Sequence, residues 1–294
     1  MKRAYLQYGA ALLLFGSNGI VASGIGLASY EIVFYRTLIG SLFLSAVFWL
    51  TGQKPTVQHC RRDLLLIALS GICMGASWMF LYEAYAQAGV GLASLLYYCG
   101  PVLVMLASPF LFREKLTRAK CAGFALVLCG AVLINGAAAG GGNARGLFCG
   151  LMSAVLYAGM IVFQKKTGRV TGLENAALQL WAGFFTVAAF VWIRGGVSLP
   201  DGTGEWVRIG MLGLLNTGAG CWMYFSALGR LPVQTVAVCG YAEPLAAVAL
   251  SALLLHEALT AAQLVGAGLL VGGAALCELN PKRRGGAGDT TPFL

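Results

Sequence analysis

Long apolar runs dominate this chain and leave few architectures open to it. Each run has about twenty residues, which is enough to cross the ~30 Å hydrocarbon core of a bilayer as a helix. A membrane β-barrel would need strands that alternate polar and apolar residues, and these runs do not alternate. The sequence therefore predicts an all-α polytopic membrane protein with ten transmembrane helices. They are expected at residues 5–26, 31–51, 64–86, 91–112, 119–138, 145–164, 174–194, 206–228, 233–255 and 262–279.

The composition agrees with lipid as the surrounding solvent. Of the 294 residues, 59% are hydrophobic and 11% are charged, whereas about a quarter of a soluble domain is charged. The connections between the apolar runs are short, so they leave no room for a separate soluble domain.

The basic residues are distributed unevenly between the predicted connections. If the N-terminus lies in the cytoplasm, cytoplasmic segments carry sixteen of the twenty lysines and arginines, and the external loops hold Arg145, Arg194 and Arg208. Such a bias sets the orientation of membrane proteins. The net charge of +9 therefore reflects topology and does not indicate a nucleic-acid partner. We expect an integral protein of a bacterial plasma membrane, with both termini in the cytoplasm.

An internal repeat relates the two halves of the chain. A shift of 143 residues aligns them without a gap over roughly a hundred positions. Two of the matched pairs come from only eight glutamates, and others are Tyr, Pro and Thr pairs, which chance rarely aligns. The matches include Glu31 with Glu174, Gly40 with Gly183, Gly75 with Gly218, Tyr98 with Tyr241, Pro101 with Pro244, Glu114 with Glu257, Thr117 with Thr260, Gly123 with Gly266 and Gly130 with Gly273.

This repeat predicts two domains of five helices in opposite orientations. The first covers residues 1–138 and the second 146–280; a Gly-rich linker at 139–145 joins them, and a cytoplasmic tail without regular structure follows at 281–294. Because five is odd, the second repeat enters the membrane upside down relative to the first. Inverted repeats of this kind are a feature of secondary transporters, whose substrate binds near the midplane between the halves.

One motif recurs at equivalent positions of both halves. It reads Tyr98-Cys99-Gly100-Pro101 and Tyr241-Ala242-Glu243-Pro244, followed by Glu114-Lys115-Leu116-Thr117 and Glu257-Ala258-Leu259-Thr260. With this pattern the sequence resembles the EamA-type branch of the drug/metabolite transporter superfamily over nearly its whole length. The resemblance implies transport driven by a proton or solute gradient, and a central cavity lined by spans 1, 3, 4, 6, 8 and 9. Members that it resembles export amino acids, nucleosides, drugs or other metabolites, and some import.

We expect a secondary active transporter that exports small polar metabolites, amino acids or amines by alternating access. The alternative is an importer or exchanger of a cationic metabolite of the quaternary ammonium type. A membrane enzyme is a weaker hypothesis, because the two histidines, His59 and His256, fall in a loop and at a helix end. A scaffold role is the other less favoured alternative. The nine cysteines have no metal-type spacing, and the sequence has no HExxH motif, no P-loop and no dinucleotide fingerprint, so neither a metal nor a cofactor is expected. The inverted repeat also favours a carrier over a channel.

Glu243 is the most deeply placed charged residue of the predicted spans. A charge at the centre of a membrane helix costs ~3 kcal/mol on insertion scales, so such residues usually face a cavity or a partner. Glu243 precedes Pro244, which removes a helix hydrogen bond, and its repeat mate is Gly100. The functional interpretation is a site for a proton or a substrate cation. The structural interpretation is a protonated or paired glutamate that joins two helices.

Arg36, Glu83 and Glu31 lie near the outer ends of their predicted spans. One interpretation is an ion pair of Arg36 with Glu31 or Glu83 that reaches toward the membrane surface. The other is a gate at the outer vestibule or a site for a substrate carboxylate.

Polar and aromatic residues occur at cavity-like depth. Trp78 and Tyr82 are four residues apart and share one helix face, so they could hold an amine by cation–π contacts. Helix packing or lipid contact is the other explanation for each ring. The predicted substrate or proton site consists of Glu243, Tyr98, Tyr241, Asn18, Trp78, Tyr82, Tyr157 and Trp222, with helix breaks at Pro101 and Pro244.

Overall fold

The protein is described by a computed structural model that covers residues 2–57, 60–88, 90–135, 143–254 and 260–278. Every regular element among these residues is a helix. In chain order the helices are α1 (Lys2–Gly16), α2 (Asn18–Ala22), α3 (Ser29–Leu50), α4 (Arg61–Ala88), α5 (Val90–Tyr97), α6 (Cys99–Phe112), α7 (Arg118–Asn135), α8 (Ala144–Lys165), α9 (Gly172–Ile193), α10 (Gly202–Met211), η3 (Leu212–Ala219), α11 (Gly220–Leu228), α12 (Val233–Cys239), α13 (Ala242–Leu254) and α14 (Ala261–Glu278).

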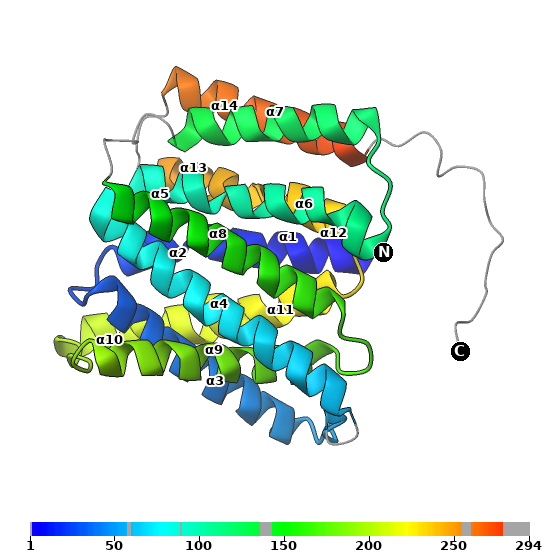
Figure 1. Ribbon diagram of the computed structural model, residues 1–294. Coiled ribbons are helices and arrows are strands. Elements are labelled where there is room, and N and C mark those ends of the chain that lie inside the picture. Colours follow the sequence, from blue (N-terminus) through cyan, green and yellow to red (C-terminus); the bar gives the residue numbers. More distant parts are fainter. Residues whose placement is uncertain (1, 58–59, 89, 136–142, 255–259, 279–294) are drawn as a thin grey trace.

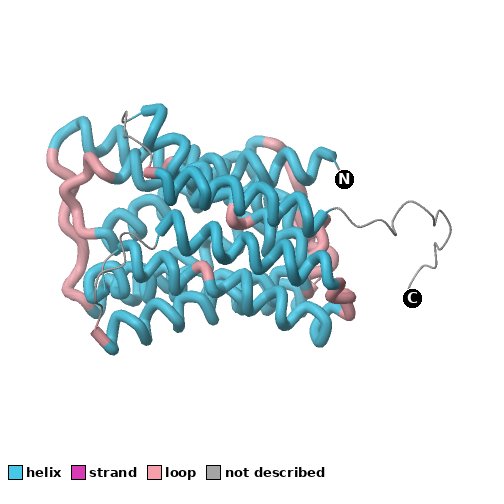
Figure 2. The backbone as a smooth tube through the Cα atoms, turned by 90° about the horizontal axis from the view of Figure 1, so that it is seen from above, coloured by secondary structure: helices cyan, strands magenta, loops and turns pink. Residues whose placement is uncertain are grey.

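The helices lie side by side along one direction, and the connections gather at two ends of the bundle (Figure 2). Helix α1 begins and helix α14 ends at the same end (Figure 1). We call this the near end, and we call the opposite end, where residues 23–28 join α2 to α3, the far end. The predicted tail at 281–294 and Glu257 lie outside the described residues, as does the linker before Asn143.

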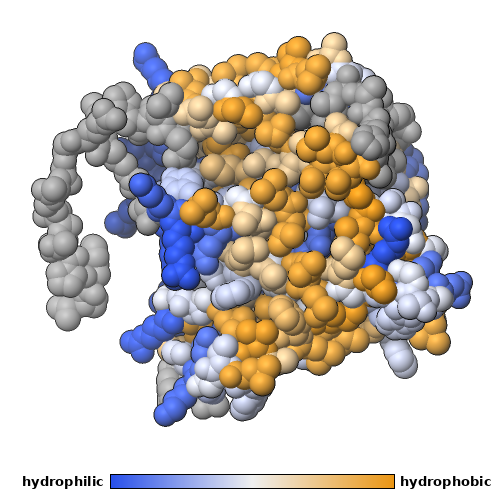
Figure 3. All heavy atoms as spheres, turned by 180° about the vertical axis from the view of Figure 1, so that it is seen from behind, coloured by the Kyte–Doolittle hydropathy of each residue, from blue (hydrophilic) through white to orange (hydrophobic). Residues whose placement is uncertain are grey.

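The outer surface of the bundle suits a lipid environment. Among the described residues, six helical stretches are long and apolar enough to cross a membrane: Ser29–Leu50, Arg61–Ala88, Leu92–Phe112, Ala144–Lys165, Gly172–Ile193 and Val233–Leu254. Large apolar side chains such as Phe110 and Ile193 remain more than four-fifths exposed. Seen from behind, the surface is mostly apolar across its middle, with hydrophilic residues gathered toward the two ends (Figure 3). An apolar belt of this kind identifies an integral membrane protein.

Within the part of the chain that the structure describes, three of the predicted spans are interrupted along their length. The run at 5–26 is divided at Ser17, the run at 91–112 at Tyr98, and the run at 233–255 at Gly240 and Tyr241. In the last two cases a proline, Pro101 or Pro244, is the third residue of the new helix. Proline is tolerated there because the first N–H groups of a helix have no partner within it.

Carboxylates fasten the connections at both ends of the bundle. At the far end, Glu31 accepts a hydrogen bond of 2.6 Å from the backbone N–H of Ser198. At the near end, Glu174 accepts one of 2.8 Å from the N–H of Val57. Asp63 accepts three more, from the N–H groups of residues 168–170. The sequence positions of Glu31 and Glu174 differ by the repeat shift of 143. The two carboxylates make equivalent contacts, because each accepts a hydrogen bond from a backbone N–H group of a connection.

Helices α7 and α14 form a closely packed pair along one side of the bundle (Figure 1). A Cβ added at Gly273 would lie 2.4 Å from the carbonyl oxygen of Gly123, and one added at Gly130 would lie 2.6 Å from that of Gly266. Small residues allow membrane helices to approach at backbone distance. The glycines matched by the repeat therefore make the contact between these two helices.

We expect Gly273→Ala to destabilise the protein by about 1–3 kcal/mol, because the methyl group would overlap the backbone of α7. Gly272→Ala is the matched control, since a Cβ at Gly272 meets nothing within 4 Å. The measurement is thermal unfolding of both purified variants in detergent. Equal stability of the two variants would contradict the close contact.

Candidate functional site

A central cavity lies among the interrupted helices. It consists of an inner chamber of about 80 Å³ and a larger chamber of about 540 Å³. The larger chamber extends to Ser23 and Ser29, and therefore toward the far end. Both chambers are lined by Phe15, Asn18, Arg36, Trp78, Tyr97 and Glu243.

The helix interruptions bring the polar residues of the cavity together. Helix α1 approaches α13 at Gly16, where a Cβ would lie 2.7 Å from that of Ala246 and 3.0 Å from the carbonyl oxygen of Glu243. Asn18 is the first residue of α2, just after the interruption, and Glu243 is the second residue of α13. Both side chains consequently line the cavity where two helices begin.

Helix α4 contributes one continuous face to the cavity. Its lining residues follow one another at intervals of three and one, which places them on one side of a helix. They are Met74, Ser77, Trp78, Leu81, Tyr82 and Tyr85.

Arg36 and Asn18 both have buried polar atoms without a hydrogen-bond partner. Arg36 is only 8% exposed, and its Nε is unpartnered, as is the Oδ1 atom of Asn18. The guanidinium lies 4.8 Å from the centroid of the Trp78 ring, which provides a cation–π contact. Unpartnered buried polar atoms cost free energy, and both of these residues line the cavity. Among the described residues no cluster of three His, Cys, Asp or Glu suggests a metal site.

The predicted ion pair of Arg36 with Glu83 or Glu31 is wrong. Glu83 instead pairs with Arg194 at 2.6 Å and with Arg145 at 3.0 Å. Glu31 accepts backbone hydrogen bonds from Ala28 and Ser198. Arg145 and Arg194 come from α8 and from the C-terminal cap of α9, and only the packing of these helices against α4 reveals the pairing.

The structure brings most of the predicted aromatic residues to the cavity but not all of them. Trp78 lines both chambers, Tyr82 and Tyr98 line the larger one, and Tyr157 lines the inner one. Tyr241 is buried beside the cavity, where its hydroxyl donates a hydrogen bond of 2.5 Å to the carbonyl oxygen of Tyr98. Trp222, also predicted for the site, lines neither chamber and is 40% exposed.

Several cavity residues were missed by the sequence analysis. Tyr97 and Phe15 line both chambers, and Tyr85 lines the larger one. The spacing of Tyr85 from Trp78 and Tyr82 was a usable signal, because it continues the same helix face. The sequence positions of Tyr97 and Phe15 give no such signal, because the helix interruptions next to these residues set the direction of their side chains.

Polar side chains of both halves contact residues 231–234 at the near end of the bundle. Glu114 accepts hydrogen bonds from the backbone N–H groups of Val233, at 2.8 Å, and Gln234, at 3.1 Å. The ammonium groups of Lys165 and Lys120 donate to the Leu231 carbonyl and to the Gln234 side chain. The larger chamber thus reaches toward the far end, whereas these hydrogen bonds join segments at the near end.

Comparison with known proteins points to one family. The model of the EamA-like transporter family matches residues 3–136 and again residues 144–278. A solved structure superposes with a TM-score of 0.80 at 24% identity, over 94% of this chain and 97% of the other; at this identity the likeness concerns the fold.

Curated relatives include proteins named as exporters. A probable terminal-alkyne amino-acid exporter of Streptantibioticus cattleyicolor is 31% identical over 89% of this chain and 85% of its own length. An aromatic amino acid exporter of Ancylobacter novellus is 28% identical over 69% of this chain and 72% of its own. An uncharacterized transporter of Bacillus subtilis is 26% identical over 84% and 80%, respectively.

A double-mutant cycle on stability should separate the observed ion pair from the predicted one. We expect Glu83→Gln and Arg194→Gln to couple by about 0.2–1 kcal/mol, as part-exposed pairs do. Glu83→Gln and Arg36→Gln should be additive, because no contact joins these side chains. A larger coupling of Glu83 with Arg36 than with Arg194 would contradict the observed pairing.

Proposed function

The chain belongs to the EamA-like transporter family, within the drug/metabolite transporter superfamily, and we propose that it exports amino acids or closely related metabolites by alternating access. The family match and the relatives named as amino-acid exporters support this choice of solute. The observation that carries it is a cavity holding one buried arginine and one glutamate that make no ion pair with each other. An enzyme is disfavoured by the same family and relatives.

Arg36 and Glu243 are suited to the two charges of a free amino acid. Arg36 would bind the α-carboxylate, since a guanidinium forms paired hydrogen bonds with carboxylates. Glu243 would bind the α-ammonium group, with the free Oδ1 of Asn18 as a second acceptor. The solute would thus satisfy charges that are costly inside a membrane while they remain unpaired.

The aromatic residues would surround the side chain of the solute. Phe15, Tyr97 and Tyr157 line the inner chamber with Glu243, and apolar walls with a few polar groups are usual in small-molecule sites. A cage for a quaternary ammonium group is less well supported, because the guanidinium of Arg36 already lies over the Trp78 ring.

Ten spans in two inverted repeats would provide the alternating access. The two separate matches to the family model support this arrangement. So do the equivalent contacts of Glu31 and Glu174, which lie 143 residues apart. In the opposite state the near-end contacts of Glu114 would open and the far end would close. A proton taken up or released by Glu243 would couple the cycle to a proton gradient.

Transport in proteoliposomes should show which charge of the solute each residue recognises. For phenylalanine as the probe, we expect the wild type to prefer the free amino acid over both its methyl ester and its N-acetyl form. Arg36→Gln should abolish the preference over the ester, and Glu243→Gln the preference over the N-acetyl form, each with at least a tenfold loss of phenylalanine transport.

Glu83→Gln is the matched control, because Glu83 lines no part of the central cavity. It should transport phenylalanine at nearly the wild-type rate. We also expect Glu243→Gln to purify normally and to flatten the dependence of solute binding on pH. Wild-type transport and an unchanged pH profile in Glu243→Gln would remove Glu243 from the proposed site.

Reporter fusions test the proposed orientation. A reporter after Pro281 should give a cytoplasmic signal, and one within residues 200–204, near Asp201, should give an external signal. A cytoplasmic signal from residues 200–204 would contradict the proposed orientation. Cytoplasmic signals from both reporters would contradict the ten-span inverted repeat, because three spans separate the two positions.

A further inference from the structure

A second pocket lies on the side of the bundle, between α4, α8 and α9. This lateral groove has a volume of about 380 Å³ and is lined by Ala76, Met79, Phe80, Phe148, Cys149, Thr186 and Phe190, with Glu83, Arg145 and Arg194. It shares no lining residue with the central cavity. Its volume falls within the ~300–1,000 Å³ range of small-molecule sites.

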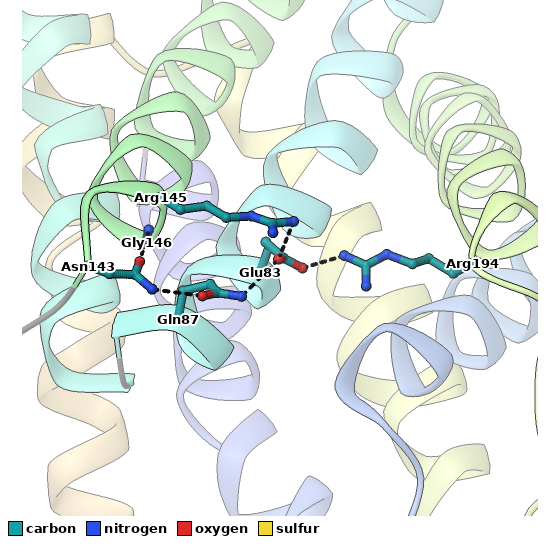
Figure 4. Close-up of polar contacts among 6 residues, drawn as sticks. All are labelled: Glu83, Gln87, Asn143, Arg145, Gly146 and Arg194. Carbon is teal, nitrogen blue, oxygen red and sulfur yellow. Dashed lines mark hydrogen bonds and ion pairs between the residues drawn. The ribbon is translucent and has the colours of Figure 1, made fainter.

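Charged residues border this groove at the far end of the bundle. The Glu83 carboxylate lies between the guanidinium groups of Arg145 and Arg194, as Figure 4 shows. Gln87 donates a hydrogen bond to Glu83 at 3.3 Å and accepts one from Asn143 at 2.9 Å. Two arginines and one glutamate leave one positive charge in excess.

The two arginines remain accessible to an anion. Their side chains are 65% and 44% exposed, whereas that of Glu83 is 17% exposed. The guanidinium of Arg194 lies 5.3 Å from the centroid of the Phe190 ring, which is part of the groove wall. Exposed ion pairs contribute little free energy, so a phosphate group can bind both arginines without a large loss. Glu83 keeps them together beside the apolar wall.

The location of the groove indicates what occupies it. Helices α4, α8 and α9 each have the length and hydropathy of a membrane span, and Phe148 in the groove wall is 56% exposed. In a membrane this face meets lipid. An apolar groove beside an excess of positive charge complements a molecule with a hydrocarbon chain and an anionic headgroup.

We propose that the lateral groove binds an anionic membrane phospholipid, with its phosphate at Arg145 and Arg194 and one acyl chain against Phe80, Phe148 and Phe190. The bound lipid bridges α4, α8 and α9 and thereby stabilises their packing. This site is independent of the solute in the central cavity.

Thermal unfolding of the purified full-length protein tests the proposal. Phosphatidylglycerol, added to protein in a neutral detergent, should raise Tm by several degrees, because a ligand that binds only the folded state stabilises it. Phosphatidylcholine at the same concentration should raise Tm less. In the variant Arg145→Gln/Arg194→Gln the difference between the two lipids should disappear. Arg208→Gln removes a far-end arginine that does not line the groove, and it should respond as the wild type does.

Two further measurements distinguish a lipid from a free anion. Ala76→Phe fills the groove and leaves both arginines in place, so it should weaken the response to phosphatidylglycerol. Inorganic phosphate should not reproduce the response of the wild type. If the double variant does not purify, Arg145→Gln alone should shift the phosphatidylglycerol midpoint severalfold upward. Equal responses to the two lipids, an undiminished response in the arginine variants, or an equal effect of inorganic phosphate would overturn the proposal.

Discussion

Backbone polar groups inside a membrane cannot form hydrogen bonds with lipid, and the central cavity depends on how this constraint is met. Helices are interrupted at Ser17, at Tyr98 and at Gly240–Tyr241, and side chains from other helices stabilise these points. The amide of Asn216, within the π-helical segment η3, donates to the Leu14 carbonyl at 2.6 Å and to Ser17 Oγ at 2.8 Å. The hydroxyl of Tyr241 donates to the carbonyl of Tyr98. The interruptions persist because protein groups replace the missing water.

The helices that begin after these interruptions also show why the two halves contribute different side chains to the cavity. Glu243 and its repeat mate Gly100 both lie at the second position of a helix that follows an interruption. A Cβ at Gly100 would lie 2.6 Å from the ring of Tyr157, so a glutamate cannot occupy that position without displacing the ring. Among the described lining residues Glu243 is therefore the one carboxylate, and the buried Arg36 lines the same two chambers.

The charged residues at the two ends of the bundle have different roles from those in the cavity. Carboxylates at both ends receive backbone N–H groups from connections of the other half, as Glu31 does from Ser198 and Glu114 from Val233. Such hydrogen bonds to a charged acceptor are strong, and they hold connections whose backbone has no helical partner. Glu83 holds two arginines instead. Because these acidic groups are engaged elsewhere, none of them pairs with Arg36.

The sequence by itself determined that this protein lies in a membrane, that it is helical and which family it belongs to, because the length of an apolar run and the repeated motif are local properties. It also identified Glu243, Asn18 and Trp78 as cavity residues, since a polar or aromatic residue deep in an apolar run needs a partner other than lipid. Only the tertiary structure decided which charges pair. The partners of Glu83 lie 62 and 111 positions away along the chain. Trp222 is 40% exposed and lines neither chamber, whereas Tyr157 lines the inner one. Depth along a helix follows from sequence position, whereas the direction of a side chain toward the cavity or the membrane depends on how the helices pack against one another.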